Sequence, residues 1–484
     1  MQFNSYIFIL AFLPAFIIIY FFINRINIKF SRVFIIVAGM VFYLYAGIQS
    51  FVALCISCVF NIIIYKALNK SDGDNRKKAL LFVGIVVNII PLVVYKYSNL
   101  IITTMNDVFH TQHASVNLIL PLGISFFTFQ QIMYIVGVYK NEIEYLGIID
   151  YLSYVFFFPK LVMGPITEPN YLLKQFNNDD NKVIKYENIA SGIKVFCFGL
   201  FKKMILADTF AKGVNWGFEN IDIASSGDLI LVMLFYTFEI YFDFSGYSDM
   251  AFGISKMINI DLPINFDSPY KALSVRDFWK RWHVSLTSFF TKYIYYPLGG
   301  SRKGKIRTCI NIMFVFLISG LWHGANWTFI LWGVIYGVLQ VIERIFERYY
   351  NKLFDVVKWI YTFGVINVLW LLFRADSIAQ WHNIIYRILT LKNINISDKL
   401  INEISVPEIT TLLNLIGLGS ITSAIRGFIP LVFLILGFII CLIPNNNYKS
   451  YKRTNAFSLI VAVMVFVWSF ISLGSESVFL YNNF

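Results

Sequence analysis

Residues 316–339 read FLISGLWHGANWTFILWGVIYGVL, an apolar stretch that contains a single ionisable side chain, His323. A helix that crosses a bilayer needs about 20 apolar residues, and this stretch has that character on both sides of the histidine. An ionisable side chain is costly in hydrocarbon, so one that lies within the membrane indicates a functional site. Imidazole is also well suited to move protons near neutral pH. His323 is therefore the first candidate catalytic residue.

The composition extends this interpretation to the whole chain. Of its 484 residues, 58% are hydrophobic and only 14% are charged. A soluble protein with this balance would expose large apolar patches, so lipid is the solvent for most of the chain. We predict an all-α integral membrane protein with about eleven or twelve transmembrane helices and additional re-entrant or interfacial helices.

We predict one membrane domain over residues 1–484, with no appended soluble domain. It divides into N-terminal spans (1–117), a catalytic core (118–345), C-terminal spans (346–473) and an extracellular tail (474–484). The expected spans include Tyr151–Pro165 and a last span at Phe457–Leu473.

The net charge of +12 sets the expected orientation. Lys and Arg gather in short loops, and such loops remain in the cytoplasm. The loops that follow the first and third apolar runs both carry several basic residues, which places the N-terminus and the C-terminus outside the cell. The same charge also favours a basic cytoplasmic mouth that attracts an anionic substrate.

The region 242–340 is richer in polar residues, glycine and tryptophan than a lipid-facing helix requires. Five aspartates lie in or between its apolar runs: Asp243, Asp249, Asp261, Asp267 and Asp277. Buried charges need partners, and Arg276, Lys280 and Arg281 are close in sequence. Interspersed prolines and glycines favour irregular backbone, which persists at membrane depth only around a protein-lined cavity. We therefore expect a polar cavity here.

This region resembles the membrane-bound O-acyltransferases, in particular the bacterial branch that O-acetylates extracellular polysaccharides. The resemblance rests on the motifs LPLGISF at 120–126, DFWKRWH at 277–283, YPLGG at 296–300 and GLWHGA at 320–325. It implies helices around a tunnel that is open on both faces of the membrane. An acyl thioester, acetyl-CoA in our interpretation, enters from the cytoplasm, and a hydroxyl acceptor approaches from the other side.

The resemblance makes His323 the central catalytic residue, acting as a general base, and places His283 in the same active region, where it holds the donor or polarises its carbonyl. Arg276, Lys280 and Arg281 are candidate ligands for the phosphates of the donor. No metal and no tightly bound cofactor are expected. Each histidine also has a purely structural alternative. His323 would only pack between Trp322 and Trp327, and His283 would only lie at a helix end near the membrane interface.

The C-terminal residues 479–484 read FLYNNF and resemble a Phe-x-Tyr-x-x-Phe motif found at the ends of this branch. We expect Tyr481 to accept the acyl group as a phenolic ester. It would then pass the group to an extracellular transferase of the esterase (SGNH) type, which acetylates a polysaccharide. The alternative is an aromatic anchor at the membrane interface.

The predicted function is therefore O-acetyl transfer across a bacterial plasma membrane, with no role in nucleic-acid binding. One alternative with similar chemistry is D-alanyl transfer to teichoic acid from a carrier protein. A transporter is an alternative of a different class, although the sequence lacks the paired broken helices that transporters show.

Overall fold

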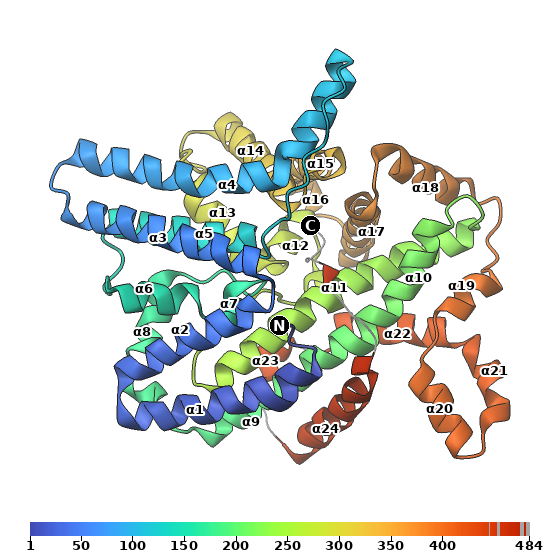
Figure 1. Ribbon diagram of the computed structural model, residues 1–484. Coiled ribbons are helices and arrows are strands. Elements are labelled where there is room, and N and C mark those ends of the chain that lie inside the picture. The colour runs from blue at the N-terminus through green and yellow to red at the C-terminus, as the bar shows by residue number, and fades with distance from the viewer. Residues whose placement is uncertain (445, 453–454, 475–478, 481–484) are drawn as a thin grey trace. The chain divides into compact units, whose positions relative to one another are not determined.

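The computed structural model describes residues 1–484 except 445, 453–454, 475–478 and 481–484. The described residues form helices joined by loops, and the one β-bridge found among them pairs Phe266 with Trp282. The predicted all-α class is therefore confirmed (Figure 1).

Two compact units can be distinguished by the contacts within each. The first consists mainly of Met1–Phe196 and Tyr247–Pro263, and the second mainly of Cys197–Gly246 and Ile264–Ser450 together with the described residues from Asn455 onward. Our expectation of one membrane domain over the whole chain stays a prediction.

The first unit holds α1 (Leu13–Ile26), α2 (Ile28–Leu44), α3 (Ile48–Lys70), α4 (Asp74–Phe109), α5 (Ile124–Tyr139), α6 (Ile148–Val155), α7 (Phe158–Leu161) and α8 (Pro169–Phe176). The boundary between the units falls within α9 (Tyr186–Phe201) and α11 (Ser226–Met257). The second unit holds α10 (Asp208–Glu219), α12 (Val275–Arg281), α13 (Val284–Phe290), α14 (Lys305–His323), α15 (Trp327–Ile345), α16 (Glu347–Tyr350), α17 (Asp355–Arg374), α18 (Ile378–Thr390), α19 (Asp398–Glu403), α20 (Pro407–Leu415), α21 (Thr422–Arg426), α22 (Ile429–Leu442), α23 (Asn447–Ser450) and α24 (Ala456–Ile471).

Among the described residues, 8 helices are long and apolar enough to cross a membrane: α1 with the turn before it, α3, α4, α11, α14, α15, α17 and α24. Two shorter apolar helices, α5 and α22, add to this set. The expected span at Tyr151–Pro165 is wrong, because the chain there forms α6 and the four-residue α7 instead. Phe157 is extended, and Pro159 lies in the first turn of α7, where a missing N–H costs no helical hydrogen bond.

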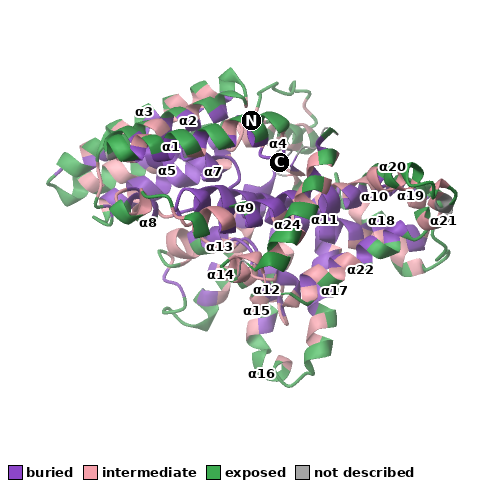
Figure 2. Ribbon diagram, turned by 90° about the horizontal axis from the view of Figure 1, so that it is seen from below, coloured by how far each residue is buried: buried purple, intermediate pink, exposed green. Residues whose placement is uncertain are grey.

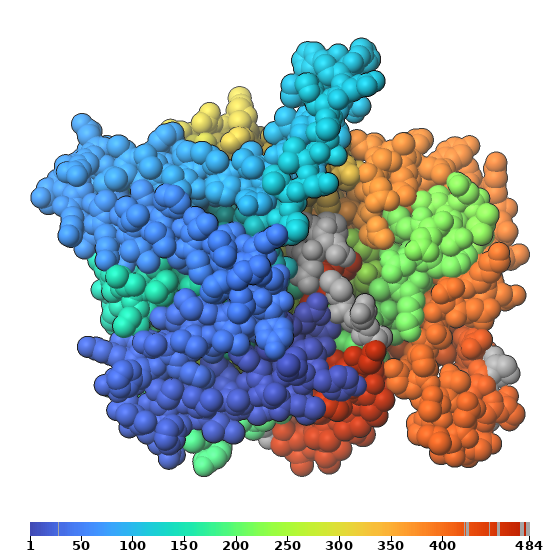
Figure 3. All heavy atoms as spheres, viewed as in Figure 1, coloured from blue at the N-terminus to red at the C-terminus, as the bar shows by residue number. Residues whose placement is uncertain are grey.

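Burial separates the central helices from those that face outward. In α11, 78% of the most apolar window is buried, against 11% in α4 (Figure 2). Side chains of α4 lie on the outer surface in Figure 3. By length and composition α4 is a candidate span, and its low burial is what a lipid-facing helix requires.

The helices α14 and α15 form a close antiparallel hairpin, in which two glycines permit the backbones to touch. A Cβ atom added to Gly320 would lie 2.3 Å from the Phe329 carbonyl oxygen, and one added to Gly333 would lie 2.4 Å from the Phe316 carbonyl oxygen. Small residues of this kind are typical of tight helix pairs in membranes. The hairpin fixes the end of α14, where His323 lies.

Candidate active site

His323 is the last residue of α14 and is 3% exposed. Its imidazole meets three aromatic rings edge to face, with centroid distances of 4.8 Å to Trp322, 5.1 Å to Trp332 and 5.2 Å to Phe373. The ring thus lies in an aromatic enclosure built from α14, α15 and α17. Trp327, the second tryptophan of the structural alternative, is 52% exposed.

His283 lies close to this enclosure. It is fully buried and forms the N-cap of α13 with φ = 45°, a left-handed conformation that is uncommon for histidine. Its ring centroid is 4.8 Å from that of Phe244 and 6.0 Å from that of Trp322. Trp322 therefore contacts both histidines, and the structure brings these two candidate residues together. Their catalytic roles stay predictions.

Backbone contacts hold His283 in its strained conformation. The neighbouring Val284 N–H donates to the carbonyl oxygen of Asn265 at 3.0 Å, and the Ser285 hydroxyl donates to the Asn265 side-chain oxygen at 2.6 Å. Residues kept in sparsely populated conformations cluster at functional sites, because the surrounding structure must compensate for the strain. Burial lowers the pKa of His283, which lies outside the candidate spans, to about 3, so its ring is neutral at physiological pH.

Two cavities adjoin the aromatic enclosure, and both belong to the second unit. The first, which we call the basic cavity, has a volume of about 430 Å³; its lining includes Arg276, Trp279, Lys280, Ser319, Gln340 and Arg344. The second, the acidic cavity, has a volume of about 370 Å³; its lining includes Lys203, Asp208, Glu239, Asp243, Asn326 and Arg374.

These cavities open at opposite ends of α15. Phe329, in its first turn, lines the acidic cavity, and Arg344, in its last turn, lines the basic cavity. Phe329 and Arg344 are 15 positions apart, which corresponds to about 22 Å along the helix axis. His323 lines neither cavity, but Ser319, one turn before it, lines the basic cavity, and its ring neighbour Phe373 lines the acidic cavity.

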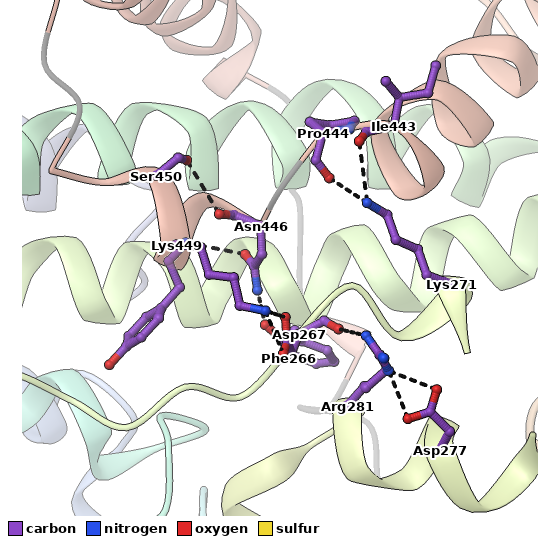
Figure 4. Close-up of polar contacts among 11 residues, drawn as sticks. Phe266, Asp267, Lys271, Asp277, Arg281, Ile443, Pro444, Asn446, Lys449 and Ser450 are labelled. Carbon is purple, nitrogen blue, oxygen red and sulfur yellow. Dashed lines mark hydrogen bonds and ion pairs between the residues drawn. The ribbon is translucent and has the colours of Figure 1, made fainter. Parts of the chain in front are cut away.

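The three predicted donor ligands are not all brought together. Arg276 and Lys280 line the basic cavity, whereas Arg281 is not among its lining residues. The Arg281 Nε donates to both carboxylate oxygens of Asp277 at 3.0 Å, and its guanidinium also reaches the Asp267 carbonyl oxygen at 3.4 Å (Figure 4). Arg281 thus joins α12 to the preceding loop, while Arg344, which the sequence did not single out, completes the basic lining.

The aspartates of this region find partners that are both near and distant in sequence. Asp277 pairs with Arg281, as expected, but Asp267 pairs with Lys449 at 2.7 Å and Asp261 pairs with Lys256 at 2.7 Å. The Lys449–Asp267 pair ties α23 to the loop before α12 (Figure 4). The expectation that Arg276, Lys280 and Arg281 would neutralise the group was therefore correct only for Arg281.

Sequence reasoning missed most of the acidic cavity. Lys203 Nζ lies 2.8 Å from Asp243 Oδ1 and 2.8 Å from Asp208 Oδ1. Asp208 follows Lys203 by five residues, and a π-helical turn at Lys202–Ala207 stacks them, with the Asp208 N–H donating to the Lys203 carbonyl oxygen. A search for pairs at α-helical spacing overlooks such a contact, because i,i+3 and i,i+4 are the neighbours it tests.

Tyr481 lies outside the described residues, and its role as an acyl acceptor stays a prediction. Leu480, directly before it, lines the acidic cavity. His382 is exposed on α18 and lines neither cavity.

Comparisons with known proteins identify the family of this chain. A family model described as MBOAT, membrane-bound O-acyltransferase family, matches residues 88–379. A peptidoglycan O-acetyltransferase of Helicobacter pylori is 33% identical over 100% of this chain and 97% of its own length. A probable alginate O-acetylase AlgI of Pseudomonas aeruginosa is 33% identical over 78% of this chain and 73% of its own length. A teichoic acid D-alanyltransferase of Bacillus subtilis is 27% identical over 64% of this chain.

Proposed function

The chain belongs to the membrane-bound O-acyltransferase family, and we propose that it takes an acetyl group from cytoplasmic acetyl-CoA and passes it across the membrane for O-acetylation of an extracellular polysaccharide. The observation that supports the proposal is that His323 adjoins lining residues of two cavities of opposite character. In the proposed arrangement the two cavities join at this ring, so that donor and acceptor meet there from opposite sides of the bilayer.

The basic cavity is the proposed donor site. Arg276, Lys280 and Arg344 line it, and such cations bind the phosphates of coenzyme A. At the same end of the hairpin, the loop before α14 carries Arg302 and Lys303, and α14 begins at Lys305; basic loops remain in the cytoplasm. The acidic cavity then faces outward, towards the acceptor.

In the proposed reaction the acceptor hydroxyl oxygen attacks the thioester carbonyl, and a nitrogen of His323 takes the hydroxyl proton. The C–S bond breaks, an ester forms, and the proton passes to the leaving thiolate, so that coenzyme A departs as a free thiol. A well-placed general base supplies about 10²–10⁴-fold in rate. His283, neutral because of its burial, is placed to orient the donor beside Trp322.

The relay completes the proposal. Tyr481 is the first acceptor, and a separate extracellular transferase of the esterase type moves the acetyl group from its phenol to the polysaccharide. The full-length likeness to a peptidoglycan O-acetyltransferase supports peptidoglycan as the acceptor polymer. The alternative of D-alanyl transfer is supported by the more distant similarity to teichoic acid D-alanyltransferases. The alternative of a transporter is less favoured, because the chain belongs to an acyltransferase family.

The test is transfer by the purified protein in sealed vesicles. Acetyl-CoA labelled on the acetyl group is supplied on one side, and labelled ester is measured on the other. We expect His323→Ala to lose transfer and His382→Ala, a change at an exposed histidine of α18, to keep it. Equal transfer by both variants would remove His323 as the base. Replacing acetyl-CoA with D-alanyl carrier protein separates the two acyl donors.

A further inference from the structure

The chain end returns to the acidic cavity. Leu480 lines that cavity, and its backbone N–H donates to Asp243 Oδ2 at 3.1 Å. Phe479 is 1% exposed, so it is packed inside the second unit rather than lying on its surface. A terminal segment needs such contacts to stay ordered, because chain ends otherwise fray.

The acceptor of this hydrogen bond belongs to a buried charge cluster. Lys203 stands between Asp243 and Asp208, with its Nζ 2.8 Å from one oxygen of each. The side chains of Lys203 and Asp243 are each 3% exposed. One ammonium between two carboxylates leaves a net negative charge, which favours an additional N–H donor. The backbone of Leu480 provides that donor.

The cation of the cluster reaches the same segment. Lys203 Nζ lies 4.9 Å from the centroid of the Phe479 ring, within the range of a cation–π contact. Two consecutive tail residues are therefore held by two members of one cluster: Phe479 by Lys203, and Leu480 by Asp243.

We infer that Lys203 and Asp243 form a docking site for the chain's own C-terminal segment, and that they act as positioning residues for Tyr481. The role of Tyr481 rests on the proposed relay, but the docking itself does not. Because Tyr481 is covalently joined to Leu480, an anchor at Leu480 limits the volume that its phenol can search. The cavity that holds Leu480 is also lined by Phe373, whose ring contacts His323.

Stability alone gives little reason for this cluster. Well-packed apolar residues can replace a buried ion pair without loss of stability, and often with a gain. One carboxylate would also suffice to neutralise one lysine. The second carboxylate gives the cluster the negative charge with which it holds a backbone N–H of the tail.

Carboxypeptidase digestion of the full-length protein in detergent tests the docking directly. The protease removes residues from the C-terminus one at a time, and intact mass spectrometry reports where it stops. We expect wild type to keep the residues at positions 479 and 480, while Asp243→Ala and Phe479→Ala lose the residues at both positions about tenfold faster. Asp243→Ala removes a hydrogen bond to a charged group, which is worth about that factor or more, and Phe479→Ala removes the ring that contacts Lys203. Asp355→Ala, which removes an exposed carboxylate paired with Lys358, is the matched control and should behave as wild type.

The Asp243→Ala variant could expose the tail merely by disturbing the fold around the buried charges. The Phe479→Ala variant controls for this effect, because it changes the tail and leaves the charged residues intact. Truncating a buried aromatic side chain itself destabilises a protein, so the unfolding temperature of this variant is measured alongside and the digestion is carried out where the variant remains folded. If wild type loses Leu480 as fast as this variant does, or as fast as the chain unfolded in urea, the docking site does not exist.

Kinetics then separate positioning from a purely structural role. Phe479→Ala should lower kcat for acetyl transfer about tenfold without changing KM for acetyl-CoA, because the donor site lies at the other end of α15. Loss of tail protection with unchanged kcat would refute the positioning role. The Tyr481→Phe variant should keep the protected tail, so continued transfer in that variant would reject the relay and leave the docking standing.

Discussion

The imidazole of His323 and the indole of Trp332 meet edge to face, with 5.1 Å between their ring centroids and an interplanar angle of 78°. Trp332 is fully buried and also contacts Trp279, a lining residue of the basic cavity, at 5.4 Å. One indole thus links the candidate base to the proposed donor site, and its shape limits the orientations that the imidazole can adopt.

We expect Trp332→Ala to lower kcat at least about tenfold and to destabilise the protein, because truncating a buried aromatic residue costs about 3–5 kcal/mol. Trp332→Phe keeps an aromatic edge against His323 and should retain most of the transfer activity. Trp359→Phe, on α17 away from His323, is the control. Transfer rates and unfolding temperatures measured together distinguish the two effects, and full activity in Trp332→Ala would show that the indole does not orient the base.

The contact between α14 and α15 predicts a large difference between two glycines. Gly333→Ala places a Cβ atom 2.4 Å from the Phe316 carbonyl oxygen, so the helices must separate and displace His323. We expect a lower unfolding temperature and a loss of transfer of tenfold or more, on the order of the cost of overpacking. Gly364→Ala, where nothing lies within 4 Å of the added atom, should be neutral or slightly stabilising. Similar behaviour of the two variants would contradict the close contact.

The basic cavity predicts which cations bind the donor. Lys280→Gln should raise KM for acetyl-CoA about tenfold with a smaller effect on kcat, the loss expected when one charge-assisted contact is removed. Arg281→Gln should leave KM nearly unchanged, because Arg281 is engaged with Asp277. Steady-state kinetics over a range of acetyl-CoA concentrations measure both. A larger KM effect at Arg281 than at Lys280 would place the donor elsewhere.

The burial of His283 predicts a dependence of stability on pH. Its pKa is lowered to about 3 in the folded protein from a reference value of 6.5, so the unfolded chain binds more protons between these values. The contribution of neutral His283 to the free energy of unfolding is complete above pH 6.5 and is lost as the pH falls towards the folded pKa. The free energy of unfolding then falls by at most about 1.4 kcal/mol per pH unit. His283→Asn should flatten the fall in unfolding temperature between pH 6.5 and pH 4, and His382→Asn should not.

The relay predicts a result in cells. Tyr481→Phe removes only the phenolic oxygen, so acetylation of the polysaccharide should fall to background while the protein remains in the membrane. Ester content of the isolated polymer and the amount of protein in the membrane fraction are the two measurements. Unchanged acetylation with normal protein levels would leave the tail as an interface anchor.

Several features of this protein follow from local pattern. The apolar runs predicted helices, because each run contains enough residues to satisfy its own backbone hydrogen bonds in lipid. His323 was recognisable because an ionisable group in such a run is costly, and its neighbours in sequence resemble a family motif. The break at Pro159 was missed, since hydropathy measures composition over a window and does not register where one proline starts a new helix.

The partners of the charged residues could not be read from the sequence. The cation nearest to Asp243 in sequence is Lys256, 13 positions on, yet Asp243 pairs with Lys203, which is 40 positions away. Arg344 joins Lys280 in one cavity although 64 positions separate them. Such pairings depend on which helices pack together, and a periodicity within one helix carries no information about its neighbour.

The sequence by itself determined that the chain is helical, lies in a membrane and carries a histidine within an apolar run, where an ionisable side chain costs free energy. Hydropathy and side-chain chemistry are properties of each segment alone. Tertiary structure decided that residues next to this histidine line a basic cavity and an acidic cavity, and that Leu480 reaches the second one. Burial and distance between segments are properties of the packed helices, so no single segment of the sequence could reveal which cavities adjoin the histidine.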